Sequence, residues 1–234
     1  MLSVNIIHNK DCLETMAQWP DNAVDVIVTS PPWNAKKNYG PYSTDKKEDY
    51  VKWLDTLCKE MERVAANAVY VFMSQEYMWE LKESLAGFCQ WLYYHRRNIG
   101  ATGRIKNYWI KTITPIAMSV TQKKIKMETN VQGIPTIDFI SGVNPQSNYI
   151  DNKRVHPAQD PIEAYLPLVA RTPGEVFYDP FMGSGTLALT ALKLGKKYIG
   201  SEINPEFVEI ANKRIKGAKS QVDIFTEQLT IGGS

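Results

Sequence analysis

The sequence lacks acidic residues over a long internal stretch, since none occurs between Glu83 and Glu128. The basic residues of that stretch are Arg96, Arg97, Arg104, Lys106, Lys111, Lys123, Lys124 and Lys126, interleaved with Tyr93, Tyr94, Tyr108 and Trp109. The net charge of only +2 conceals this asymmetry. Basic side chains mixed with aromatic rings are typical of a surface for a polyanion. A solvated face above core aromatics explains the pattern equally well.

Cysteine is scarce, and long apolar runs are absent. Cys12, Cys58 and Cys89 lie far apart, without a CxxC pair or a neighbouring histidine pattern, so neither a disulfide framework nor a zinc site is supported. No stretch approaches the ~20 uncharged apolar residues of a membrane span, and the first residues do not resemble a secretory leader. We therefore expect a soluble cytoplasmic protein with reduced thiols and no membrane partner.

The chain alternates predicted strands and helices, which favours an α/β fold with a mostly parallel sheet. Its 234 residues, 44% of them hydrophobic, suffice for one domain with a full core. Strands are predicted near 4–8, 24–29, 68–73, 175–179 and 197–201, and helices near 12–18, 48–65, 75–86, 161–171, 186–194 and 205–216. Strands and loops are expected over 91–127 and a long irregular connection over 128–155; the residues after Lys216 receive no assignment.

A glycine turn follows the predicted strand 175–179. Gly183 and Gly185 let a ligand approach the backbone, and Glu202, at the end of the next strand, suits the hydroxyls of a ribose. With Ala188 the glycines also match a dinucleotide pattern, which leaves an NAD oxidoreductase as an alternative. Asp179 argues against it, because a carboxylate repels a pyrophosphate but attracts the ammonium and sulfonium of S-adenosylmethionine. An ordinary helix-capping aspartate is the structural alternative.

Four segments carry a resemblance: TSPPW, HPAQDP, DPFMGSGT and GSEINPEF. Together they resemble the amino-methylating DNA methyltransferases of the permuted β-class, in which the catalytic motif precedes the cofactor motif. The resemblance covers about residues 4–34 and 156–214. It implies a Rossmann-like methyltransferase fold with a seven-stranded sheet and one reversed strand. It also implies S-adenosylmethionine as methyl donor, S-adenosylhomocysteine as product, and no metal.

The resemblance also implies roles for individual residues. The target-base site would comprise Ser30, Pro31, Pro32 and Trp33. The cofactor site would comprise Asp11, Cys12, His156, Pro157, Asp179, Pro180, Phe181, Gly183, Ser184, Gly185, Glu202 and Ile203. Within it, Asp11 would contact the adenine and Glu202 the ribose, while His156 and Pro157 would close over the methionine end. Three residues depart from the common pattern: Trp33 stands for Tyr or Phe, and Ala158 and Asp160 stand for Thr and Lys.

The chemistry of such a site depends on activating a poor nucleophile. The lone pair of an exocyclic amine is delocalised into the ring, and acceptors such as the Ser30 hydroxyl and the Pro31 carbonyl can localise it. Two prolines fix that carbonyl before the substrate arrives. Flipping the base out of a duplex costs a few kcal/mol, and stacking on Trp33 recovers ~1–3 kcal/mol. Positioning and electrostatics would supply most of the catalysis.

Ser30, in place of the aspartate usual in adenine enzymes, favours cytosine N4 as the target, with adenine N6 as the close alternative. Methylation on carbon is disfavoured, because an enzyme that methylates C5 of cytosine needs a cysteine nucleophile, commonly after a proline. None of the three cysteines follows a proline. An RNA methyltransferase, and a nucleotide- or DNA-binding module without catalysis, are the other hypotheses.

The chain is expected to be a single catalytic domain, 1–234, in which residues 91–155 form a small embedded recognition region. The residues expected to contact double-stranded DNA are Lys36, Lys37, Arg96, Arg97, Arg104, Lys106, Lys123, Lys124 and Lys126. For Lys36 and Lys37 a solvated loop is an equal alternative. The sequence leaves open a partner restriction endonuclease, a homodimer and the target site.

Overall fold

The computed structural model describes residues 2–35, 48–97, 111–122, 125–129, 131–134, 136–143, 149–150, 153–154 and 160–231. Its strands are β1 (Ile6–His8), β2 (Val24–Thr29), β3 (Ala65–Phe72), β4 (Phe88–Arg96), β5 (Ile113–Val120), β6 (Phe139–Gly142), β7 (Tyr149–Ile150), β8 (Lys153–Arg154), β9 (Val176–Asp179) and β10 (Lys197–Ser201). Its helices are α1 (Cys12–Met16), α2 (Tyr50–Val64), the 3-10 turn η1 (Gln75–Tyr77), α3 (Met78–Ser84), α4 (Ile162–Arg171), α5 (Thr186–Lys193) and α6 (Pro205–Ile231).

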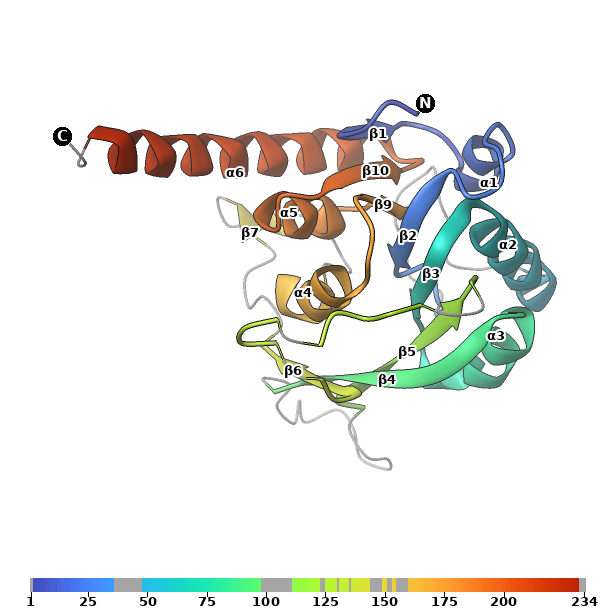
Figure 1. The fold of residues 1–234 in the computed structure, drawn as a ribbon. Helices are drawn as coiled ribbons and strands as arrows, with labels where there is room; N and C mark the ends of the chain where they lie inside the picture. Colours follow the sequence, from blue (N-terminus) through green and yellow to red (C-terminus); the bar gives the residue numbers. More distant parts are fainter. Residues whose placement is uncertain are drawn as a thin grey trace.

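Within these residues the main sheet has eight strands, in the order β1-β10-β9-β2-β3-β5-β4-β6 (Figure 1). Only β5 runs against its neighbours, so the expected α/β fold with a mostly parallel sheet and one reversed strand is confirmed. The resemblance implied seven strands. The extra strand is β6, which belongs to the segment 128–155 that was expected to be irregular and which pairs with β4.

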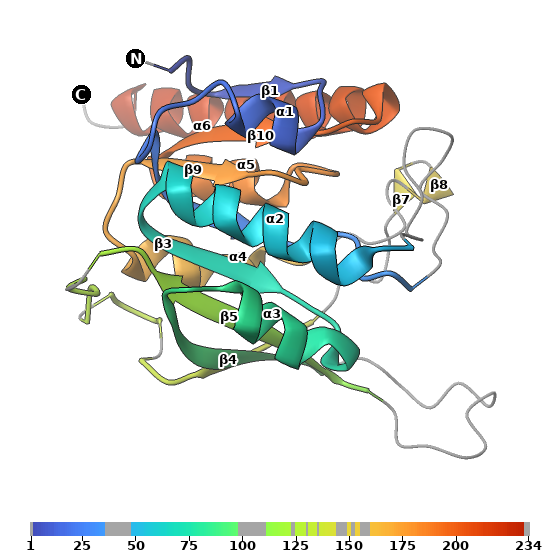
Figure 2. The same cartoon turned by 90° about the vertical axis from the view of Figure 1, so that its right-hand side faces the viewer.

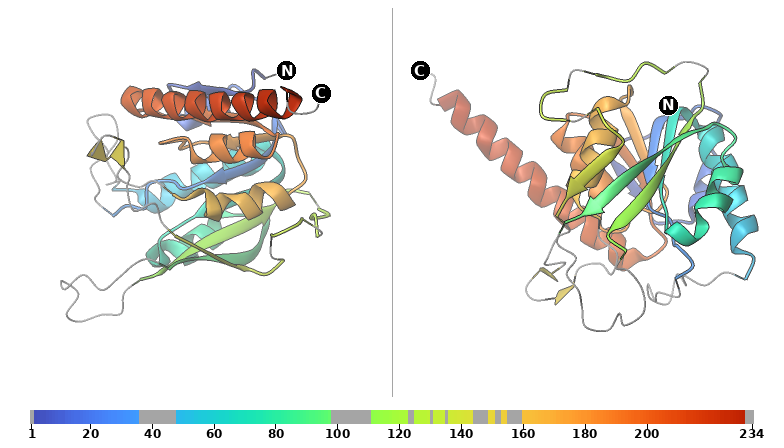
Figure 3. Two further views of the ribbon diagram at one scale, coloured as in Figure 1. Left: turned by 90° about the vertical axis from the view of Figure 1, so that its left-hand side faces the viewer. Right: turned by 90° about the horizontal axis from the view of Figure 1, so that it is seen from below.

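Helices cover both faces of the sheet, with α1, α2 and α3 on one side (Figure 2) and α4, α5 and α6 on the other (Figure 3). The buried strand β2 supplies both cores, because alternate side chains point to opposite faces. Val26 and Val28 pack with Leu187 of α5, while Ile27 packs with Leu54 of α2 and Met16 of α1. This double burial explains why four of the six residues of β2 are Val or Ile.

The parallel strands all end at one edge of the sheet, which we call the carboxyl edge. It holds His8, Thr29, Phe72, Arg96, Asp179 and Ser201. The opposite edge, where these strands begin, we call the amino edge. Because β5 is reversed, the chain that follows it lies at the amino edge, where the Thr121 amide donates to the Asn67 carbonyl and the Glu128 amide to the Arg171 carbonyl.

The last helix differs most from the expectation. A helix was predicted over 205–216, but α6 continues to Ile231 and its second half extends past the body of the domain (Figures 1 and 3). Ala211 and Ile215 anchor its first half in the core. Gly217 weakens a helix by only about 1 kcal/mol and does not end this one. No helix in the described part of the chain is long and apolar enough to cross a membrane.

Candidate active site

Two predicted motifs meet at the carboxyl edge, although they are far apart in the sequence. Strand β2 pairs in parallel with β9, and β9 with β10, so the Ser30 turn and the glycine turn follow adjacent strands. The order of connection reverses between β9 and β2, since α2 covers one face and α5 the other (Figure 1). Ligands of open α/β sheets bind at such a switch point, outside the carboxyl ends of the strands.

Asp179 is a buried carboxylate at this switch point, with 3% of its surface exposed. Its Oδ1 accepts hydrogen bonds from the Thr29 hydroxyl at 2.6 Å and from the Phe181 amide at 2.9 Å. Burial raises the pKa of Asp179 to about 7, and the nearby charges of Asp160 and Glu202 add to that rise, while the two donors oppose it. The carboxylate therefore carries a charge that a bound cation would stabilise.

The glycine turn owes its shape to two residues with positive φ, Gly183 at 49° and Gly185 at 84°. A Cβ at Gly185 would lie 3.2 Å from the Ala211 Cβ, so the turn also permits close packing of α5 on α6. The Arg214 guanidinium donates to the Ser184 carbonyl. The turn is thus a fixed backbone surface beside Asp179.

Glu202, which follows β10, is held against this turn. Its Oε2 accepts from the Gly183 amide at 2.9 Å, and its Oε1 from the Asn204 amide at 2.8 Å. Burial raises the pKa of Glu202, and the backbone amides of Asn204, Gly183 and Ile203 oppose the rise. Each oxygen thus has a backbone donor already, which the sequence reasoning did not anticipate.

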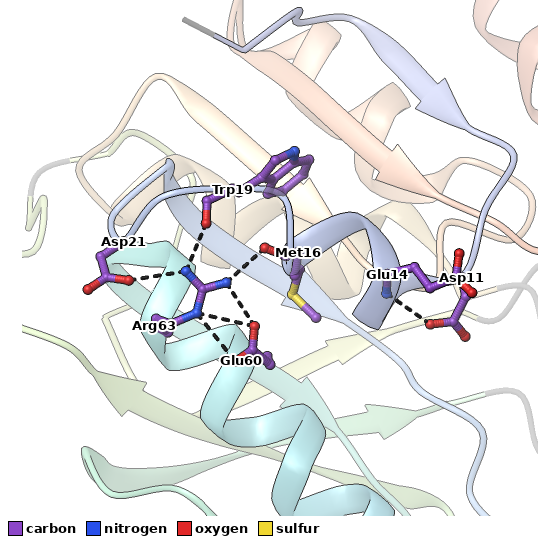
Figure 4. A network of polar contacts seen from close by, with 7 residues as sticks. All are labelled: Asp11, Glu14, Met16, Trp19, Asp21, Glu60 and Arg63. Atoms are coloured by element: carbon purple, nitrogen blue, oxygen red, sulfur yellow. Dashed lines mark hydrogen bonds and ion pairs between the residues drawn. The ribbon is translucent and has the colours of Figure 1, made fainter.

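Asp11 caps α1 and lies on the neighbouring loop. Its Oδ1 accepts from the Leu13 amide at 2.8 Å and the Glu14 amide at 3.3 Å, as Figure 4 shows for Glu14. Asn9 ties this loop to the end of β10, because its side-chain amide donates to the Glu202 carbonyl at 2.9 Å. The structure therefore brings the predicted adenine and ribose residues to neighbouring loops.

Arg63 of α2 holds the other end of α1 (Figure 4). Its guanidinium donates to the Met16 and Trp19 carbonyls, each at 2.8 Å, and pairs with Glu60 and Asp21. The carbonyl of Met16, the last residue of α1, has no partner within the helix, and it accepts from this arginine and from the Trp19 amide. The Asp11 loop is thereby positioned from both ends of α1.

The Ser30 turn is fixed by side chains from other elements. The Tyr50 hydroxyl donates to the Pro32 carbonyl at 2.7 Å, and the Trp33 indole donates to the Phe72 carbonyl at 3.1 Å. Trp33 is half-buried and packs against both cores. No described group donates to the Ser30 hydroxyl or the Pro31 carbonyl.

Two tyrosines close the turn, and the sequence reasoning missed both. Asn34, at φ 56°, donates to the Tyr77 hydroxyl at 3.0 Å, and the rings of Tyr50 and Tyr77 lie 4.6 Å apart. No sequence signal identifies these tyrosines, because their contact depends on where α2 and η1 pack.

A hollow of about 530 Å³ adjoins the two tyrosines. It is lined by Asn34, Glu48, Asp49, Tyr50, Val51, Lys52, Asp55 and Tyr77. Three carboxylates against one lysine make this hollow unsuited to a phosphate.

The predicted basic residues fall into two groups. Arg96 is the last residue of β4 and Arg97 follows it, at the carboxyl edge, where the Arg96 guanidinium donates to the Lys111 carbonyl at 2.8 Å. Lys111 pairs with Glu76 at 2.9 Å. Lys126 is exposed but belongs to the chain at the amino edge, so the structure does not bring it together with Ser30.

The remaining predicted residues are distributed as follows. Cys12, Pro180 and Ser184 are buried, Phe181 is half-buried against Trp53, and Ile203 is exposed. Lys36, Lys37, Arg104, Lys106, Lys123, Lys124, His156 and Pro157 lie outside the described residues. Among the residues that are described, no group of three His, Cys, Asp or Glu side chains could hold a metal ion.

Comparison of the fold with solved structures identifies DNA methyltransferases. The PvuII DNA methyltransferase, described as cytosine-N4-specific, aligns with a TM-score of 0.74 and 18% identity over 95% of this chain and 93% of its own. A complex of M1.HpyAVI with SAM aligns with a TM-score of 0.64 and 20% identity over 89% and 98%. These likenesses confirm the methyltransferase fold.

Comparison of the sequence with known proteins reaches the same class. The type II methyltransferase M.HpaI of Haemophilus parainfluenzae is 26% identical over 94% of this chain and 76% of its own. The DNA adenine methyltransferase YhdJ of Escherichia coli (strain K12) is 28% identical over 90% and 82%. The model of the N6/N4 methyltransferases, described as DNA methylase, matches residues 90–213. This chain is therefore a member of the N6/N4 DNA methylase family.

Proposed function

We propose that this amino DNA methyltransferase transfers a methyl group from S-adenosylmethionine to the N4 atom of a cytosine flipped out of duplex DNA. The observation that carries the proposal is the junction of the Ser30 turn with the Asp179 turn at adjacent strand ends. The 2.6 Å hydrogen bond between Thr29 and Asp179 makes that junction direct. A site for the methyl donor next to a site for the methyl acceptor suits direct methyl transfer between two bound molecules.

The residues around Asp179 fit S-adenosylmethionine. Asp179 Oδ2 is left for the ammonium group, since both described donors use Oδ1. Glu202 and Asp11 lie on neighbouring loops suited to the ribose and the adenine, and the glycine turn lets the ligand approach the backbone. When bound, this cofactor supplies an electrophilic methyl group on a sulfonium. His156 and Pro157 remain candidates for closing the methionine end.

The Ser30 turn fits an exocyclic amine. Tyr50 occupies the Pro32 carbonyl, which leaves the Ser30 hydroxyl and the Pro31 carbonyl as acceptors for the amine hydrogens. Two prolines and the bond from Trp33 to Phe72 restrict movement of these acceptors, so little reorganisation is needed during the reaction. Trp33 offers a ring for stacking the flipped base.

Cytosine is favoured over adenine by Ser30. A neutral hydroxyl can accept from the amine and donate to the ring nitrogen beside it, which is N3 in cytosine and N1 in adenine. The preference for cytosine therefore rests on the family pattern, in which adenine enzymes usually have an aspartate at this position. The adenine N6 reading is the second candidate, supported by the similarity to YhdJ.

The DNA would approach the carboxyl edge, where Arg96, Arg97 and Lys111 lie at the same edge of the sheet as the Ser30 turn. In this proposal the chain is one catalytic domain and residues 91–155 contribute recognition. The relatives named as type II methyltransferases suggest a partner endonuclease. Transfer to structured RNA is the competing substrate assignment.

The test is methylation of mixed-sequence duplex DNA with labelled S-adenosylmethionine, followed by mass analysis of the nucleosides and mapping of modified sites. We expect N4-methylcytosine in the duplex and no label in a structured RNA. N6-methyladenine alone would overturn the cytosine assignment, and label in RNA alone would overturn the DNA assignment. The Ser30→Ala variant, which loses one acceptor, controls for a contaminating methyltransferase.

A further inference from the structure

Thr29 makes a buried contact that its neighbours in the motif do not make. It is the last residue of β2, it is fully buried, and its hydroxyl donates to Asp179 across 150 residues of sequence. The Phe181 amide donates to the same carboxylate oxygen. Two donors on Oδ1 fix the carboxylate plane, and no described group donates to Oδ2.

We propose that Thr29 is a positioning residue for the methyl donor, which orients Asp179 so that Oδ2 can bind the ammonium group. This inference rests on the proposed function, because it assigns a ligand to Asp179. It adds a residue to the site that acts through Asp179 and does not itself touch the substrate.

The surroundings of Asp179 make this donor necessary. The residues packed around it include two further acids, Asp160 and Glu202, which both disfavour its charge, and the hydroxyls of Tyr165 and Tyr178. Thr29 and Phe181 are the groups that lower the pKa of this carboxyl against that burial and repulsion. Loss of the Thr29 donor would therefore move the ionisation of Asp179 to higher pH.

A merely structural role for Thr29 predicts something different. If the Thr29 hydroxyl only met its own need for a hydrogen-bond partner, its removal would lower the stability of the protein. It would also lower the affinity of the site for every ligand to the same extent. A positioning role predicts a loss confined to ligands with an ammonium group, and a loss that depends on pH.

The experiment measures binding by calorimetry between pH 6 and 8 for the wild type and for the Thr29→Val, Thr29→Ala and Thr29→Ser variants. The probes are S-adenosylhomocysteine, which has the ammonium group, and 5′-methylthioadenosine, which lacks it. In the wild type, we expect the affinity for S-adenosylhomocysteine to fall up to tenfold per pH unit below about 7.

Thr29→Val should move this fall to higher pH by about one unit, which lowers affinity about five-fold at pH 7. Thr29→Ser should restore the wild-type profile, and 5′-methylthioadenosine should bind both variants alike. Thr29→Ala is the second hydroxyl-free variant if Thr29→Val does not give the wild-type circular dichroism spectrum.

An unchanged pH profile in a folded hydroxyl-free variant would overturn the inference, as would equal weakening of both probes. If both hydroxyl-free variants unfold, Thr29 is structural and the inference is also overturned. Failure of the wild type to bind S-adenosylhomocysteine at any pH would instead contradict the proposed function.

Discussion

The carboxyl and amino edges of the sheet use the same residue types in different ways. At the amino edge, both oxygens of Glu62 accept from the amides of Ala86 and Gly87, and Asp25 Oδ2 accepts from the amides of Glu175 and Val176. These acids close loops. At the carboxyl edge, Asp179 is buried, and the charges of Asp160 and Glu202 raise its pKa further.

Acids at the amino edge stabilise the fold, whereas Asp179 at the carboxyl edge is placed to bind a ligand. Acids that close loops stabilise the protein because they accept hydrogen bonds from backbone amides. Each buried amide left without a partner would cost about 1–3 kcal/mol. An ionised acid buried beside other acids lowers stability, and a bound cation offsets that cost. Matched substitutions at the two edges should therefore have different effects on stability and on turnover.

The largest expected effect is on turnover in Ser30→Ala. Losing one of the acceptors of the amine should lower kcat about 10²–10³-fold, by analogy with removal of one preorganised group from a charge-stabilising site. The matched variant is Ser119→Ala at the amino edge, where the serine hydroxyl donates to Glu62. It should lower the melting temperature and leave kcat within about three-fold. Equal losses of kcat would contradict the distinction between the edges.

Trp33→Ala should lower turnover by about 10- to 100-fold, because stacking a base on an aromatic ring contributes ~1–3 kcal/mol. The affinity for S-adenosylhomocysteine should stay nearly unchanged. Trp91→Ala is the control, since Trp91 is also half-buried but packs against Phe88 near the start of β4. If Trp33→Ala lowers the affinity for S-adenosylhomocysteine by the same factor as the turnover, the role of Trp33 is to hold the core and not to stack the base.

Asp179→Asn should stabilise the protein without cofactor above pH 7. The pKa of Asp179 is raised from 3.8 to about 7 in the fold, so the ionised side chain opposes folding and wild-type stability falls as pH rises between these values. At pH 8 the variant should gain on the order of 2 kcal/mol in the free energy of unfolding, and little at pH 4. Denaturant titrations at both pH values measure the gain.

The matched variant for that test is Asp25→Asn. It weakens charge-assisted bonds to two backbone amides, so it should lower the free energy of unfolding by about 1–2 kcal/mol at pH 8. Stabilisation by Asp25→Asn, or destabilisation by Asp179→Asn at pH 8, would remove the proposed contrast.

The smallest expected effect is on DNA affinity. The double change Arg96→Gln and Arg97→Gln should weaken binding to duplex DNA about tenfold and lower the slope of log affinity against log salt by one to two. Lys126→Gln should leave both unchanged, because Lys126 lies at the amino edge. Fluorescence anisotropy at several salt concentrations provides the measurement. A larger change for Lys126→Gln would place the DNA at the other edge.

Much of the fold could be predicted from the sequence, because local patterns determine it. Strand β2 agrees with its predicted range, and α5 ends one residue early. The pattern could not identify β6, in which exposed and buried residues alternate over only four positions and which forms a strand because it pairs with β4. Nor did the sequence pattern predict that α6 continues beyond residue 216.

The candidate site was predictable where its residues stand in motifs and not where they meet across elements. The chain order says nothing of β2 lying beside β9, so the bond from Thr29 to Asp179 could not be foreseen. The same holds for Tyr50 on the Pro32 carbonyl. Lys126 was grouped with Arg96 because both lie in the stretch without acidic residues, whereas the reversal of β5 separates them.

Hydrogen–deuterium exchange with and without S-adenosylhomocysteine measures directly where the cofactor binds. We expect slower exchange in peptides covering 9–14 and 180–186 at the carboxyl edge, and no change over 125–129 at the amino edge. Protection at the amino edge, or none at the glycine turn under saturating ligand, would contradict the claim that the cofactor binds at the carboxyl edge.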